Sequence, residues 1–166
     1  MVPLAAVVAI PALALLLGGC APGSAPTPAP TPAFASEAEA FAAAEEVYRA
    51  YNEAGNDRSD DERYLTGDAL SNDIESKRLL IENGLRIEGR SDVVAFRGTE
   101  ADVARAVATI TAEVCIDVSS SRVHNSNNED VTPEDRADRW LVEVTFVGAG
   151  NELLIAKSSP VDGPTC

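Results

Sequence analysis

Charged residues are absent from the first 36 positions of this 166-residue chain, so all 27 acidic and 13 basic side chains lie in residues 37–166. That part of the chain therefore carries the whole net charge of −14. A domain of this charge repels nucleic acid and anionic lipid headgroups, which argues against nucleic-acid partners. We interpret the acidity as serving solubility, with an acidic docking face as the alternative.

Residues that carry catalysis or bind metals are also scarce. The single histidine, His124, lies in a polar segment, and the sequence has no glycine-rich phosphate loop and no serine nucleophile elbow. Asp57-x-Ser59-x-Asp61 is similar to the start of a calcium loop, but Glu62 stands where that loop needs glycine. The sequence therefore predicts no catalytic residue, no metal, no cofactor and no enzyme activity.

An apolar run occupies residues 1–19 and ends in Leu17-Gly18-Gly19-Cys20. These residues resemble a bacterial lipobox, in which a branched aliphatic residue and two small residues precede a cysteine that receives a diacylglyceryl group. The resemblance implies a lipoprotein whose signal peptide is cut before Cys20 and whose acylated Cys20 anchors it to the extracytoplasmic side of the cell membrane. Signal peptides have positively charged residues before the apolar run, but no Lys or Arg precedes this one. We therefore place the true start a few codons upstream.

The next segment is rich in proline, alanine and threonine, and such a composition favours an extended spacer over a packed core. At ~3.1 Å per residue, residues 21–33 would hold a domain up to about 40 Å from the membrane. We therefore divide the chain into a signal peptide (1–19), a lipidated cysteine with its linker (20–35) and one domain (36–166).

Three helices are expected at the start of the domain. Ser36 with Glu39 and Ser59 with Glu62 are two capping boxes, and each predicts a helix start. A third helix is expected from about residue 68 to residue 83, with one apolar side formed by Leu70, Ile74 and Ile81.

From residue 85 onward the apolar period changes to two, which predicts strands. The longest predicted strand covers residues 104–118, and a second covers residues 139–146. Shorter strands are expected near residues 85–87, 93–95 and 153–157, with a turn at residues 125–128 and a capped helical turn at residues 132–135. Helices followed by an antiparallel sheet predict an α+β domain.

Only three cysteines are present. With Cys20 assigned to the lipid, Cys115 and Cys166 remain as a pair in an oxidising compartment, which favours a disulfide over two free thiols. The bridge would close a loop of 52 residues, for which the chain-entropy formula gives about 4 kcal/mol.

The order of elements resembles the nuclear transport factor 2-like (cystatin-like) superfamily, and more narrowly small actinobacterial lipoproteins with such a domain. The segments that carry the resemblance are residues 50–54, 64–68, 114–117, 140–144 and 161–166. It implies N-terminal helices packed in a curved antiparallel sheet that forms a cone. It also implies a disulfide between Cys115 and Cys166, and homodimers through the sheet.

The superfamily includes ketosteroid isomerases and epoxide hydrolases, whose interior holds a carboxylate base. The resemblance makes Tyr48, Tyr51, Tyr64 and Trp140 the candidates for lining a pocket here. The candidate acid, Asp117, falls opposite the apolar face of its strand, and no second buried acid is evident. We therefore expect a non-catalytic module that binds a protein or a small ligand at the cell envelope. The alternatives are an isomerase- or hydrolase-type enzyme using the conical pocket, and a passive envelope component.

Overall fold

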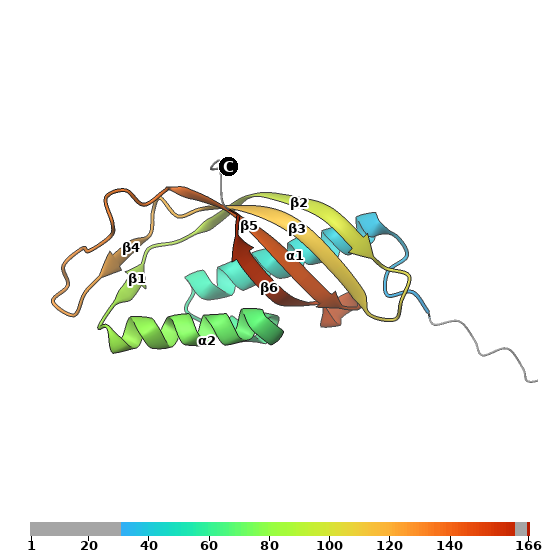
Figure 1. The fold of residues 1–166 in the computed structure, drawn as a ribbon, viewed down its shortest axis with the longest axis horizontal. Helices are drawn as coiled ribbons and strands as arrows, with labels where there is room; N and C mark the ends of the chain where they lie inside the picture. Colours follow the sequence, from blue (N-terminus) through green and yellow to red (C-terminus); the bar gives the residue numbers. More distant parts are fainter. Residues whose placement is uncertain (1–30, 162–165) are drawn as a thin grey trace, which may run out of the picture.

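The computed structural model describes residues 31–161 and Cys166. In these residues the fold is α+β: four antiparallel strands pair in the order β2-β3-β5-β6, and β1 and β4 form a separate two-stranded ribbon (Figure 1). The described strands form no closed barrel. The elements in chain order are α1 (Glu37–Asn56), the 3₁₀ turn η1 (Glu62–Tyr64), α2 (Gly67–Glu82), β1 (Arg86–Glu88), β2 (Asp92–Asp102), β3 (Ala108–Asp117), β4 (Arg122–His124), β5 (Arg139–Gly148), the 3₁₀ turn η2 (Gly150–Glu152) and β6 (Leu154–Pro160).

Helix α1 begins at the first predicted capping box. The Glu39 amide donates to Ser36 Oγ at 3.2 Å, and Glu39 Oε2 in return accepts from the Ala35 amide at 2.9 Å. Both contacts satisfy backbone donors that the first helical turn leaves free. The helix buries small residues, Ala40 and Ala44, at 0% exposure, so its backbone lies close to the sheet.

The sheet's inner face is built by the predicted alternation. Every second side chain of β3 is fully buried, and those of β5 and β6 continue the same layer: Ala108, Ile110, Ala112, Val114, Val144, Phe146 and Ile155. Gly98 of β2 lies beside Ala112, and a Cβ atom there would come within 2.2 Å of the Phe41 ring. Glycine at this position therefore lets α1 pack directly on β2.

The structure corrects three of the predicted elements. The second capping box opens only the single turn η1, which begins after Asp61 and not after Ser59. Ser59 still belongs to the end of α1, because its amide and its hydroxyl both donate to the Ala54 carbonyl, at 2.9 and 3.1 Å. The long strand begins at Ala108 and not at residue 104, because the carbonyls of residues 103 and 105 accept from the amide of Ala33. Residues 132–135 form the predicted turn, but Thr132 does not cap it, because its hydroxyl accepts from the Val123 amide at 2.8 Å. Arg136 after the turn reaches back to the Val118 and Ser121 carbonyls.

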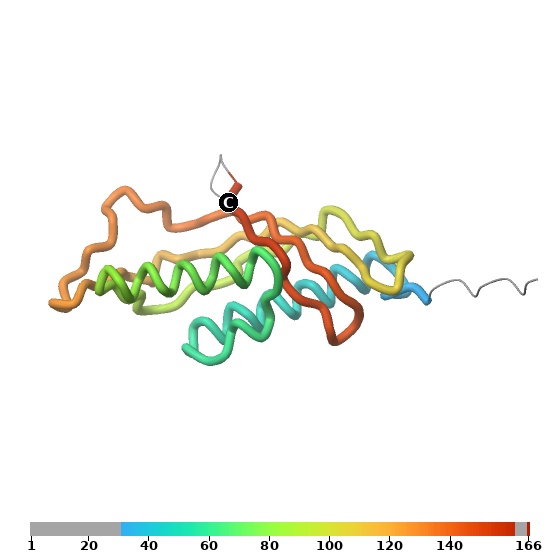
Figure 2. The backbone as a smooth tube through the Cα atoms, turned by 60° about the horizontal axis from the view of Figure 1, so that its bottom comes forward, coloured from blue at the N-terminus to red at the C-terminus, as the bar shows by residue number. Residues whose placement is uncertain are grey.

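Helix α2 lies beside α1 and packs against β6 by its first half (Figure 2). Its second half extends past the sheet toward the ribbon, and we call residues 74–88 and 122–131 the far end. Ile74 and Ile81 on α2 are 49% and 77% exposed. On the ribbon, Ile87 pairs with Val123, which neighbours Val131. The far end lies opposite the end where residue 31 enters the domain (Figure 1).

The outer face of the sheet carries the C-terminal tail. Val161 donates its amide to the Leu141 carbonyl at 2.9 Å, and Cys166 lies at disulfide distance from Cys115 of β3, with their Cα atoms 5.8 Å apart. Cys115 is therefore 3% exposed although it points away from the helices. The predicted pair of cysteines thus joins Cys166 to the face of the sheet that none of the described helices covers.

Candidate functional site

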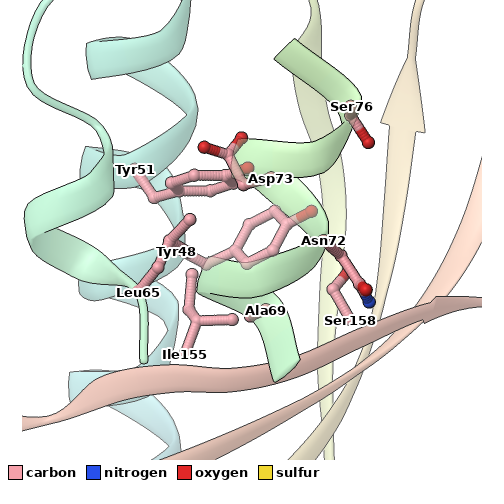
Figure 3. A pocket seen from close by; sticks show the side chains of 9 residues that line it. All are labelled: Tyr48, Tyr51, Leu65, Ala69, Asn72, Asp73, Ser76, Ile155 and Ser158. Atoms are coloured by element: carbon pink, nitrogen blue, oxygen red, sulfur yellow. The ribbon is translucent and has the colours of Figure 1, made fainter. Parts of the chain in front are cut away.

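A cleft of about 190 Å³ opens between α1, the first half of α2 and strand β6 (Figure 3). Leu65, Ala69 and Ile155 form its apolar part. The polar groups on its walls come from all three elements: Tyr48, Tyr51, Asn72, Asp73, Ser76 and Ser158. A few convergent polar groups against an apolar floor are typical of a small-molecule site, although 190 Å³ is below the ~300–1,000 Å³ of sites for drug-sized ligands.

Tyr48 and Tyr51, two of the expected pocket residues, lie one turn apart on α1 with their rings in an edge-to-face arrangement, 5.9 Å between centroids. Tyr48 is 3% exposed, and no hydrogen bond joins its hydroxyl to another described residue. Burial, followed by the nearby Tyr51, raises the pKa of Tyr48. Burial also raises the pKa of Tyr51 to about 12, with Asp73 and Asp61 adding to the effect. Both hydroxyls therefore stay protonated at neutral pH.

The α2 side of the cleft was not predicted. In Figure 3, Asp73 reaches toward Tyr51 of α1 and Asn72 lies beside Ser158 of β6, one helical turn after the buried Ala69; Ser76 follows one turn later. Positions 69, 72, 73 and 76 share one side of a helix, and on a surface helix the side toward the core is normally apolar. A polar stripe on the side that faces the domain was the signal available in the sequence.

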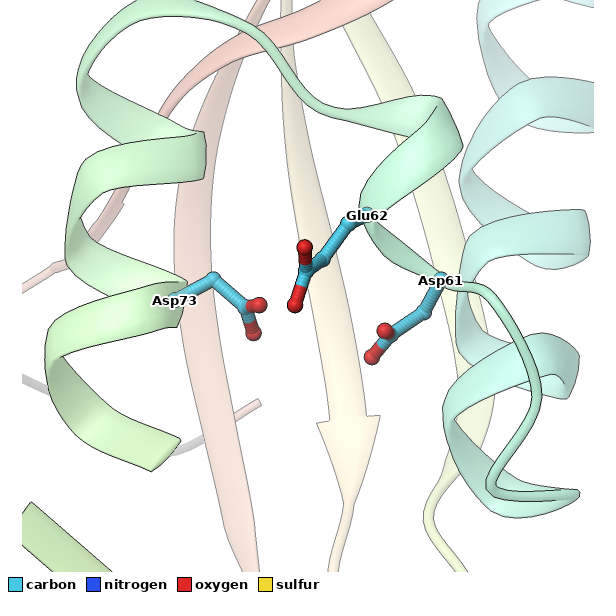
Figure 4. Close-up of side chains that lie close together, drawn as sticks. All are labelled: Asp61, Glu62 and Asp73. Atoms are coloured by element: carbon cyan, nitrogen blue, oxygen red, sulfur yellow. The ribbon is translucent and has the colours of Figure 1, made fainter. Parts of the chain in front are cut away.

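Three carboxylates gather beside the cleft, from Asp61, Glu62 and Asp73, with oxygens within 4.8 Å of one another (Figure 4). The ammonium of Lys77 lies among them, 2.7 Å from Asp61, 2.7 Å from Asp73 and 3.3 Å from Glu62. Desolvation alone would lower the pKa of Lys77, but its contacts with Asp61 and Asp73 outweigh that effect and raise it. Lys77 is therefore charged and supplies the cation that such a cluster requires.

Two of the other expected pocket residues lie outside this cleft. The Tyr64 hydroxyl accepts from Arg63 at 2.5 Å, and the Arg63 guanidinium stands 4.7 Å from the Tyr64 ring centroid. Trp140 is 45% exposed and donates its indole N–H to the Ala137 carbonyl. Tyr64 ends the three-residue turn η1, where no alternation fixes its direction. Trp140 is the second residue of the ten-residue strand β5, and its exposure shows that the start of β5 is not covered.

The candidate acid Asp117 also lies away from the cleft, at the end of β3. Its carboxylate accepts from the Ser119 hydroxyl at 2.6 Å and amide at 3.0 Å, and from Arg139 at 3.1 Å. These contacts, the Ser119 hydroxyl foremost, lower its pKa from 3.8 to about 2. A carboxylate with so low a pKa is a weak base, and its oxygens are already occupied, so the geometry gives Asp117 a structural role.

Cys20 and the linker up to residue 30 lie outside the described residues. Among the helices that the structure describes, none is long and apolar enough to cross a membrane. In comparisons with known proteins, the chain matches no protein-family model and no curated protein.

Proposed function

We propose that this protein is a lipid-anchored extracytoplasmic binding module that does not itself catalyse a reaction. The anchor is Cys20, and residues 1–19 act as its signal peptide. This part of the proposal is supported by the sequence: an apolar run, two small residues, the cysteine and a proline-rich spacer follow one another directly. Two or more acyl chains give stable attachment, because each buried methylene contributes about 0.8 kcal/mol.

Replacement of the cysteine tests the anchor. Cys20→Ala should release the protein from the membrane fraction or leave its precursor uncleaved, while Cys115→Ala, a cysteine of the domain, should stay in the membrane fraction. A Cys20→Ala protein that is shortened to the mature length and still sediments with membranes would contradict lipidation.

The cleft is the site through which the module binds a small polar ligand, and the observation that carries this is Tyr48. Tyr48 is 3% exposed, and its hydroxyl, which makes no hydrogen bond to another described residue, faces the cleft that the ring lines. A ligand in the cleft would displace water from this hydroxyl, so it must supply a polar atom to replace the hydrogen bond that the water makes. The finer identity of the fold, a nuclear transport factor 2-like cone, belongs to the same proposal and is supported by the element order.

Catalysis is the less favoured alternative because the acid in the cleft already has a partner. A proton-transfer site needs a carboxylate that is free to accept a proton from substrate, and Asp73 is paired with Lys77 at 2.7 Å. His124, the only histidine, lies on β4 at the far end. A protein-binding face and a passive envelope role remain alternatives, and homodimers through the outer sheet face would have to accommodate the C-terminal tail.

The ligand can be sought in the protein itself. Protein purified from its own membranes should retain a small molecule in native mass spectrometry, and Tyr48→Phe should lose it. Tyr64→Phe is the matched control, because the Tyr64 hydroxyl is bound to Arg63 outside the cleft. Equal retention by all three proteins, or no retained molecule at all, would contradict a ligand site at Tyr48.

A further inference from the structure

The walls of the cleft are unbalanced in charge. Of its nine lining residues, Asp73 carries the only carboxylate, and none is Lys, Arg or His. Asp73 Oδ2 is buried and lies 2.7 Å from the Lys77 ammonium, although the geometry there is not that of a hydrogen bond. The other oxygen, Oδ1, contacts no charged group among the described residues. This oxygen is the acceptor that the cleft offers to a ligand.

Lys77 does not neutralise this region, since its one positive charge is shared by three carboxylates. The side chains of Asp61 and Asp73 are only 14% and 15% exposed, so solvent screens them poorly. The net charge of −14 acts in the same direction. Anionic ligands are therefore disfavoured in this cleft, and cations are favoured.

One feature of α2 opposes this trend. The positive end of the helix dipole lies at Gly67, and it attracts anions. Its effect fades within the first turn, whereas Asn72, Asp73 and Ser76 lie in the second and third turns. The carboxylate of Asp73 therefore dominates the part of the cleft where the polar groups converge.

The tyrosines complete the site. Aromatic rings attract cations through their π-faces, and Tyr48 and Tyr51 both line the cleft. Their hydroxyls provide hydrogen-bond donors that a bare ammonium group could not use but an oxygen atom could. We infer that the cleft binds a small organic cation that carries both an ammonium group, toward Asp73, and a hydroxyl or ether oxygen, toward Tyr48. This inference rests on the proposed binding function and names its ligand class.

Three small molecules with the same two-carbon frame distinguish the cation inference from the proposed ligand site. Ethanolamine, ethylene glycol and glycolate share a two-carbon frame and one hydroxyl, and they differ in carrying a positive, a neutral and a negative second group. Each is titrated at constant ionic strength into the full chain in detergent, and the backbone amide shifts of residues 72, 73 and 76 are followed by NMR. Ethanolamine should bind about tenfold more tightly than ethylene glycol, and glycolate should be the weakest, because hydrogen bonds to a charged partner are stronger than neutral ones.

Variants then assign the binding to the named groups. Asp73→Asn should bring the ethanolamine affinity down to that of ethylene glycol, while Tyr48→Phe should weaken both probes. Lys77→Met removes the competing ammonium and should strengthen ethanolamine binding, which keeps the test valid if Asp73→Asn folds poorly. Glu75→Gln is the matched control, because this carboxylate of α2 is paired with Arg78 outside the cleft and should leave both affinities unchanged.

The outcomes distinguish the two proposals. Equal binding of ethanolamine and ethylene glycol, with loss of both in Tyr48→Phe, would overturn the cation inference and leave the ligand site standing. Ethanolamine binding that is unaffected by Asp73→Asn and Tyr48→Phe would place the cation elsewhere on the acidic surface and overturn the inference. If none of the probes shifts the cleft amides, the inference fails and the ligand site loses its support.

Discussion

Helices α1 and α2 both have acidic first turns. Other described elements of the domain cover α1, but they do not cover the second half of α2. Along α1, Ala40, Ala44 and Tyr48 are buried against the sheet. In α2 from residue 74 onward, Ile74 and Ile81 are exposed, and the exposed ion pairs of Arg78 with Glu75 and Glu82 connect only residues of the helix itself. Such exposed pairs contribute only tenths of a kcal/mol each.

The difference shows where the stability of the domain resides. Packing of an apolar face stabilises a helix far more than its own propensity or its ion pairs do. The covered half, which comprises α1 and the four-stranded sheet, should therefore carry most of the unfolding free energy. The far end should open locally at lower cost, because it has few buried apolar contacts.

Removal of a large side chain from the covered half should have the largest effect. Phe146 is fully buried in β5, and its ring lies 6.2 Å from that of Phe96. Phe146→Ala should lower the free energy of unfolding by about 3–5 kcal/mol in urea denaturation, from lost burial and the cavity left behind. A loss below about 1 kcal/mol would contradict a rigid core at this position.

The contrast between the two halves also explains which parts of the fold were predictable. The capping box at Ser36 correctly predicted the start of α1, and the alternation along residues 108–117 correctly predicted strand β3. In both, the structure that the local pattern favours also buries the apolar face. The same kind of pattern at Ser59 failed because Ser59 is held at the end of α1, where its amide and hydroxyl both donate to the Ala54 carbonyl. Leu70, Ile74 and Ile81 were correctly predicted to be helical, yet the pattern alone could not show that no element within residues 31–161 covers Ile74 and Ile81.

Only the α1 side of the candidate site was predictable from the sequence. Tyr48 and Tyr51 stood out as aromatic residues at helical spacing, and both line the cleft. Asp73 and Ser158 could not be placed there, because the sequence does not say that α2 and β6 meet across from α1. Sites formed between elements distant in the chain depend on tertiary packing, which a single sequence does not record.

Loss of the bridge between Cys115 and Cys166 should have the next largest effect. The two residues are 51 positions apart, and the chain-entropy formula gives about 4 kcal/mol for the closed loop. Cys166→Ser should therefore lower the unfolding free energy of the covered half, with Ser158→Ala on β6 as a control. An unchanged denaturation midpoint under reducing and oxidising conditions would contradict the bridge.

A smaller effect is expected at Asp117, where β3 leaves the covered half toward the ribbon. Its pKa falls from 3.8 to about 2 on folding, so it stabilises the fold above pH 3.8 and loses this contribution between pH 3.8 and about 2. Asp117→Asn should flatten the dependence of unfolding free energy on pH in that window. Ser119→Ala should flatten it in part, and an unchanged slope in both variants would contradict the lowered pKa.

The smallest effect should come from the exposed side of α2. Ile81 is 77% exposed, so Ile81→Ala should change the unfolding free energy by no more than about 0.5 kcal/mol. The matched isoleucine Ile110 is fully buried in β3, and Ile110→Ala should cost about 2–5 kcal/mol in the same urea denaturation. A large loss in Ile81→Ala would mean that another surface covers this side of α2 in solution. Such a loss should then depend on protein concentration if the covering surface is a second copy, because association stabilises the folded state by mass action.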